Sequence, residues 1–156
     1  MKNIILLRHA KAEKENYNLS DFDRKLNEKG IKQVTDLKET FFDDTPTPDL
    51  ILISSAQRTK ETYNLLFESK NYKAISTYKP DLYLASVDVI ESIVASLPDS
   101  VQTLLLIGHN NGISDFANKF GLYIGLPTCG VVVINSPLEN WTDISNTKGT
   151  ITYKSF

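Results

Sequence analysis

The stretch that decides the fold is IILLRHA, residues 4–10, close to the start of the chain. Its four consecutive apolar residues indicate a strand that is covered on both faces, as in a parallel sheet. Arg8 and His9 follow where that strand ends, and ligands of open α/β sheets bind at the carboxyl ends of the strands. Arg8 offers a fork of donors suited to a phosphate, and His9 offers a nucleophilic nitrogen beside it. Taken alone, the fragment also fits the start of a solvated loop.

Two further apolar runs end in the same way. The run LILI at 50–53 is followed by Ser54 and Ser55, and then by Arg58 in the first turn of a helix. The run TLLLI at 103–107 is followed by Gly108, His109 and Asn110. If the three strands are neighbours, two arginines and both histidines converge on one pocket. Helix N-termini would face that pocket and attract an anion. Two guanidinium groups and two imidazoles suit a dianionic phosphoryl group without a divalent metal.

The remaining patterns alternate between helices and strands along the chain. Four helices are predicted from the helical spacing of apolar residues or from capping residues. Three further strands are predicted from short runs of residues that favour strand structure. The helices are expected over 28–42, from a Ser55 cap to about Ser69, over 86–97 with Ser86 as cap, and over 112–120. The strands are expected over 73–79, 130–134 and 150–153. The alternation favours a single domain over 1–156 with an α/β fold: a three-layer α/β/α sandwich, its central sheet mostly parallel and its C-terminal edge antiparallel.

Composition sets the broad class. The chain has 156 residues, 41% of them hydrophobic and 23% charged, as in an ordinary globular protein. A net charge of −2 gives no global attraction to nucleic acid or to a membrane, and no signal-peptide or membrane-spanning pattern is evident. The single cysteine, Cys129, suits a reducing compartment and is interpreted as a small packed residue. We therefore expect a cytoplasmic monomer without a structural zinc site.

Each polar residue also has an ordinary structural explanation. Arg58 lies beside Lys60 and Glu61, so alone it is more typical of a solvated helix face. His109 alone could bond the turn that follows it, and Asn110 is a common turn residue. The joint occurrence of both histidines and two arginines just after buried strands favours a functional site over these separate explanations.

The order of short motifs resembles the histidine phosphatase superfamily, which has the phosphoglycerate mutase-like fold. The motifs run from near residue 6 to about 134, nearly the whole chain. They are LRHA at 7–10, DRKL at 23–26 with Gly30, SSAQRT at 54–59 with Thr62, LYLA at 82–85, GHN at 108–110 and LPTCGV at 126–131. The last three are similar to the SixA-like branch, the phosphohistidine phosphatases.

This resemblance implies roles for five residues. His9 would be the nucleophile that carries a transient phosphoryl group. Arg8, Arg58 and His109 would hold the phosphoryl oxygens and stabilise the charge of the transition state, and Asn110 would also contact the substrate. No cofactor or metal is implied. In-line phosphoryl transfer depends chiefly on positioning and electrostatics, which agrees with these roles.

The general acid is less well defined by the sequence. Larger branches of the superfamily use an acidic residue after the third strand, where Asp81 is the nearest carboxylate; a structural role for Asp81 is favoured. The imidazole of a phosphohistidine can be protonated before it leaves, so it depends less on an enzyme acid. We expect a metal-independent phosphatase with a phosphohistidine intermediate and an open site. Its expected substrate is a phosphohistidine-bearing protein of a phosphorelay or phosphotransfer system. A phosphatase of a small phosphoester metabolite and a non-catalytic phosphate-binding module are the alternatives.

Overall fold

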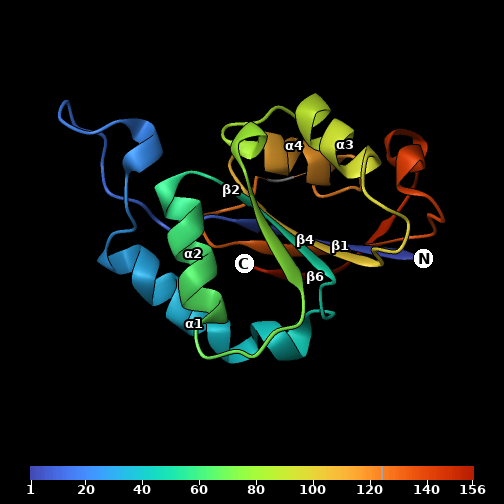
Figure 1. Ribbon diagram of the computed structural model, residues 1–156, viewed down its shortest axis with the longest axis horizontal. Coiled ribbons are helices and arrows are strands. Elements are labelled where there is room, and N and C mark those ends of the chain that lie inside the picture. Colours follow the sequence, from blue (N-terminus) through green and yellow to red (C-terminus); the bar gives the residue numbers. More distant parts are fainter. Residues whose placement is uncertain (124) are drawn as a thin grey trace.

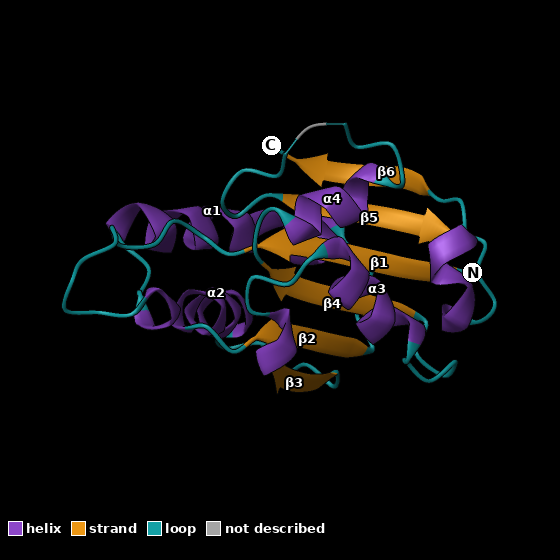
Figure 2. Ribbon diagram, turned by 90° about the horizontal axis from the view of Figure 1, so that it is seen from above, coloured by secondary structure: helices purple, strands orange, loops and turns teal. Residues whose placement is uncertain are grey.

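The computed structural model describes residues 1–123 and 125–156. Six strands form one sheet in the order β3-β2-β4-β1-β5-β6 (Figures 1 and 2). Their bounds are β1 Lys2–Arg8, β2 Leu50–Ser54, β3 Ile75–Lys79, β4 Thr103–Gly108, β5 Val131–Ser136 and β6 Thr150–Ser155. Strands β1 to β4 run parallel to one another, whereas β5 and β6 form the antiparallel edge. The predicted mixed sheet is therefore confirmed.

Helices cover both faces of this sheet, which confirms the three-layer α/β/α arrangement (Figure 1). Helices α1 and α2 pack on one face, and α3 and α4 pack on the other. The helix bounds are α1 Glu28–Asp44, α2 Gln57–Phe67, α3 Val87–Ala95 and α4 Gly112–Asn118, with short 3₁₀ helices η1 Asp21–Asp23, η2 Pro80–Leu82 and η3 Trp141–Asn146. No helix in the described part of the chain is long and apolar enough to cross a membrane.

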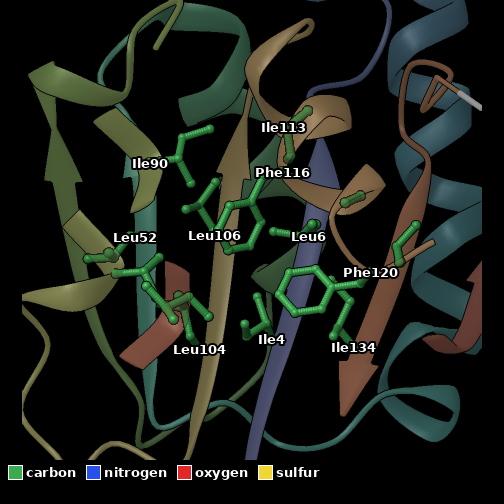
Figure 3. Close-up of a cluster of buried hydrophobic side chains, with 14 of the residues drawn as sticks. Ile4, Leu6, Leu52, Ile90, Leu104, Leu106, Ile113, Phe116, Phe120 and Ile134 are labelled. Carbon is green, nitrogen blue, oxygen red and sulfur yellow. The ribbon is translucent and has the colours of Figure 1, made fainter. Parts of the chain in front are cut away.

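The uninterrupted apolar run of β1 reflects burial on both faces of the sheet. Successive side chains of a strand point to opposite faces. Ile4 and Leu6 therefore belong to the core under α3 and α4, which Figure 3 shows, while Ile5 and Leu7 belong to the core under α1 and α2. All four are fully buried. Two separate cores thus fix β1 in the middle of the molecule.

The register of the parallel strands brings three chain segments to one edge. Strand β4 lies between β1 and β2, with Arg8 opposite Gly108 and Ile53 opposite Ile107. The three strands end at nearly the same level. The segments that follow them therefore emerge side by side, and each carries residues that the sequence marked as candidates.

The first turn of α2 differs from the prediction. The helix begins at Gln57 and its capping residue is Ala56, not Ser55; no side chain caps it. In the first turn of the helix, the Thr59 hydroxyl donates to the carbonyl of Ser54 or of Ala56, each 2.7 Å away. The helix also ends at Phe67 rather than at Ser69.

For α3 the predicted capping residue is confirmed, whereas on α1 one of the apolar residues is exposed. Ser86 caps α3 as predicted, because its hydroxyl accepts the Val89 N–H at 3.4 Å. On α1, the apolar residues Val34 and Phe41 are buried, whereas Ile31, in the first turn, is 45% exposed. Helical spacing of apolar residues therefore does not by itself decide which of them are buried.

Gly30 gives a prediction about stability. A Cβ atom at Gly30 would overlap the Lys11 carbonyl, and the Gly30 N–H donates to the Asn27 side chain at 2.9 Å. Overpacking of this kind typically costs about 1–3 kcal/mol. Gly30→Ala should therefore lower the free energy of unfolding, measured with denaturant, by roughly 2 kcal/mol. Lys29→Ala, at the exposed neighbour, should change it by less than about 0.5 kcal/mol. Equal values for both variants would contradict the tight contact.

Candidate active site

One pocket lies at the shared edge of β1, β2 and β4, with a volume of about 440 Å³. The five candidate residues of the sequence analysis all line it. The full lining is Arg8, His9, Lys11, Ala12, Glu15, Asp21, Arg24, Arg58, Leu84, His109, Asn110 and Thr128. These include all three arginines and both histidines of the chain. Arg58 is only 2% exposed, so the solvated-helix interpretation of this residue is wrong.

His9 is held as a neutral imidazole with a free nitrogen. Its Nδ1 lies 2.7 Å from the Ala10 carbonyl oxygen, which can only accept, so Nδ1 carries the proton and Nε2 keeps a lone pair. Burial lowers the pKa of His9 to about 4; the bond to Ala10 opposes this shift, and the nearby positive charge of Arg58 adds to it. His9 is therefore unprotonated near neutral pH, as a nitrogen nucleophile must be.

His109 faces His9 from the end of β4. The two ring centroids are 5.2 Å apart, and Nε2 of His109 lies 2.7 Å from Oγ of Ser54. Burial, followed by the neighbouring His9 and Arg58, lowers the pKa of His109 to about 3. The Nδ1 atom of His109 is buried and has no hydrogen-bond partner among the described residues. When the Ser54 hydroxyl donates to Nε2, this Nδ1 carries a proton and is a free donor.

The arginines leave two further donors unsatisfied. Arg8 donates from Nη1 to the Leu126 carbonyl at 2.9 Å, and Arg58 donates from Nη1 to the Asp21 carbonyl at 2.7 Å. The Nε atoms of Arg8 and Arg58 are buried without a partner in the described part of the chain. Most buried polar groups are hydrogen-bonded, so unpaired donors on two residues that line one pocket call for an explanation. An anion close enough to these N–H groups would be a suitable partner.

Asp21 and Arg24 are pocket residues that the sequence analysis did not select. Asp21 accepts bonds from Arg24, Arg58 and Tyr83. Burial acts to raise the pKa of Asp21, but these three hydrogen bonds together lower it well below its usual range. Arg58 and Tyr83 are 37 and 62 residues away from Asp21 in the sequence. Of these contacts, only the pairing of Asp21 with Arg24, three residues apart, could have been predicted from the local sequence. Lys11 and Glu15 at the mouth were also missed.

Asn110 lines the pocket, and its side-chain amide is hydrogen-bonded to other residues of the protein. Its Nδ2 donates to the Leu126 carbonyl at 3.0 Å, and its Oδ1 accepts from the Ser114 hydroxyl at 2.6 Å. Leu126 also accepts from Arg8, so Asn110 fixes the turn that holds Arg8. A contact of Asn110 with substrate remains a prediction.

Asp81 and Cys129 lie outside this cluster. Asp81 is exposed on η2 and does not line the pocket. Cys129 is buried, and burial raises the pKa of its thiol to about 12, so it is not a thiolate near neutral pH. Its backbone N–H lies 3.1 Å from the carbonyl oxygens of both Arg8 and His9. Among residues 1–123 and 125–156, no group of three His, Cys, Asp or Glu residues is arranged to hold a metal ion.

The fold and the pocket define an α/β protein with an anion-binding site at the carboxyl edge of its sheet. Residues 4–82 match the family model of the histidine phosphatase superfamily (branch 1). This match covers half of the chain, and the chain belongs to that superfamily. Within it, the chain is SixA-like. These findings support phosphatase activity.

Solved structures and a plant protein show the similarity over most of the chain. A candidate phosphohistidine phosphatase SixA from Agrobacterium tumefaciens is 27% identical, with a TM-score of 0.83 over 99% of this chain and 97% of that one. A candidate SixA from Nakamurella multipartitia is 23% identical, with a TM-score of 0.81 over 99% and 95%. An uncharacterized chloroplastic protein of Arabidopsis thaliana is 28% identical over 91% of this chain and 70% of its own length.

The histidine chemistry can be measured directly, because the chain has only two histidines. We expect both rings to titrate well below pH 6.5, since burial lowers their pKa values to about 4 and about 3. They should therefore stay neutral as the pH falls through 6.5 and gain protons only below it. Long-range ¹H–¹⁵N NMR spectra should also show His9 protonated on Nδ1. A pKa near 6.5 or a proton on Nε2 of His9 would contradict the structure.

Proposed function

We propose that this protein is a metal-independent phosphatase that acts through a phosphohistidine intermediate on His9. Its proposed substrate is phosphohistidine on a protein partner of the phosphorelay or phosphotransfer type, in the cytoplasm. The observation that carries the proposal is the free Nε2 of a neutral His9 in a pocket lined by Arg8, Arg58 and His109, whose buried Nε, Nε and Nδ1 atoms have no hydrogen-bond partner among the described residues. The similarity to the candidate SixA from Agrobacterium supports the choice of substrate.

The charge of the pocket fits a phosphoryl group. Four cationic side chains face two carboxylates in the lining, and both histidines are neutral. Two net positive charges remain, which match the two negative charges of a phosphoryl dianion. The protein's own side chains can therefore offset the substrate charge.

The proposed reaction has two in-line steps at phosphorus. In the first, Nε2 of His9 attacks the phosphorus, and the P–N bond to the substrate imidazole breaks. The leaving imidazole keeps that electron pair and departs neutral, because its other nitrogen was protonated beforehand. In the second step, water attacks the phosphorus and the electron pair of the P–Nε2 bond returns to His9. The water supplies the new hydroxyl of the phosphate, and its other proton passes to solvent.

Three side chains stabilise the transferring group in both steps. Arg8, Arg58 and His109 surround the pocket in which His9 attacks, so their free N–H groups can bind the phosphoryl oxygens. Because these donors are fixed and buried before the reaction, they stabilise the transition-state charge without reorganising. Asn110 lies at the wall of the same pocket and contacts the substrate there in this proposal.

Neither Asp21 nor Asp81 is suited to act as a general acid, which leaves Glu15 as the only other carboxylate of the described pocket lining and favours a phosphoramidate over an alkyl phosphate. Asp21 is hydrogen-bonded by two arginines and a tyrosine, and its lowered pKa keeps it ionised. It is therefore unable to donate a proton to a leaving alkoxide. Asp81 lies outside the pocket. An imidazole that is already protonated needs no such donor.

The proposal predicts turnover of a phosphohistidine substrate. We expect the protein to release many phosphates per chain from a histidine-phosphorylated carrier protein in the presence of a chelator. His9→Ala should reduce release to the spontaneous rate, because the nucleophile is gone. Lys60→Ala, which removes a cation of α2 outside the pocket lining, should leave release unchanged.

A parallel assay with p-nitrophenyl phosphate separates the alternatives. Release from this small ester alone would contradict the protein substrate and favour a metabolite phosphatase. Binding of phosphate without release from either compound would favour a non-catalytic module.

A further inference from the structure

We propose that Asp21 is a positioning residue that holds Arg58 ready to bind the phosphoryl group. Its effect on turnover rests on the proposed function, whereas its hold on Arg58 does not. Arg58 Nη1 donates to the Asp21 backbone carbonyl at 2.7 Å, and Nη2 donates to its Oδ2 at 3.0 Å. One residue thus binds both ends of the guanidinium fork. The buried Nε–H of Arg58 has no hydrogen-bond partner among residues 1–123 and 125–156.

Asp21 is itself fixed from two other directions. Arg24 donates to Oδ1 from Nε at 3.0 Å and from Nη2 at 2.6 Å. The Tyr83 hydroxyl donates to Oδ2 at 2.5 Å. The carboxylate therefore joins η1, the start of α2 and the segment after η2, three parts of the chain that are distant in sequence. Arg24 is anchored in turn, because its Nη1 donates to the Glu13 carbonyl at 2.6 Å.

This arrangement has a consequence for catalysis. A free arginine side chain loses about 2 kcal/mol of rotamer entropy when it is fixed. Asp21 fixes Arg58 before the substrate arrives, so binding and transition-state stabilisation do not bear that cost. Asp21 also places a negative charge between Arg24 and Arg58, which reduces their mutual repulsion. An ordinary surface ion pair would have neither effect, and such pairs contribute little to stability.

The matched control is Asp23, on the same 3₁₀ helix. Its carboxylate accepts from the Ser20 hydroxyl at 2.7 Å, and the pocket lining does not include it. Asp21→Asn keeps the size of the side chain but removes its charge, and Asp23→Asn makes the same change two residues away. Both variants remove one carboxylate from η1. If they differ in Arg58 order or in kcat, the difference is therefore due to the contacts of Asp21 and not to the loss of a charge on this helix.

The first readout does not depend on turnover. The chain has three arginines, so a ¹⁵N NMR spectrum of arginine Nε–H groups contains three signals, and Arg58→Lys identifies the one from Arg58. We expect that signal to be ordered in the unmodified protein and to shift when tungstate, a tetrahedral dianion, is added. Asp21→Asn keeps the backbone carbonyl that accepts from Arg58 Nη1 but weakens the bond from Nη2, because the carboxylate charge is lost. The Arg58 signal should therefore be less ordered in Asp21→Asn than in Asp23→Asn. An Arg58 signal that is equally ordered in both variants would overturn the proposal.

The second readout is kcat in a double-mutant cycle. Asp21→Asn should lower kcat by about 10- to 100-fold, and Arg58→Ala by about 10²- to 10³-fold. In the Arg58→Ala background, Asp21→Asn should lower kcat by less than about 2-fold, because it acts through Arg58. Additive losses would overturn the positioning role. If the unmodified protein shows no phosphatase activity while Asp21→Asn still makes Arg58 less ordered, the proposed function fails and the hold on Arg58 stands.

Discussion

The pairing of β4 with both β1 and β2 is the constraint on which the site depends. Its register sets Arg8 opposite Gly108 and Ile53 opposite Ile107, so the three strands end together. The residues after these strands are about 50 positions apart in sequence. Burial of β1 and β4 in two cores holds that register, since a shift by one residue would reverse which core each side chain enters. The site is thus a product of core packing.

Burial then determines the chemistry of the side chains at this edge. Desolvation lowers the pKa values of His9 and His109 and keeps both imidazoles neutral. Within the described residues, the buried Nε atoms of Arg8 and Arg58 and the buried Nδ1 of His109 have no hydrogen-bond partner. An unpaired buried polar group typically costs about 1–3 kcal/mol. A phosphoryl group bound to these atoms would remove that cost, as expected of a preorganised anion site.

Much of this arrangement could be predicted from short-range sequence patterns. The apolar run at 4–7 indicates a strand buried on both faces, and the polar residues after three such runs indicate a shared edge. Other features depend on long-range contacts. The sequence around Arg58 does not indicate that this residue is buried, because the nearby Lys60 is typical of a solvated helix face. The contact of Asp21 with Tyr83 joins residues 62 positions apart. The predicted capping residue of α2, Ser55, was wrong because the helix begins one residue later, after Ala56, a residue whose side chain has no atom that could cap it.

In the proposed reaction His9 carries the phosphoryl group, and trapping that intermediate would test this step. The protein would be mixed with a histidine-phosphorylated carrier, quenched in base within a single turnover, and analysed by mass spectrometry of its peptides. Phosphohistidine is stable in base, so the account predicts a phosphoryl group on His9 and none on His109. Phosphate release without modification of His9, or modification of another residue in its place, would contradict the account.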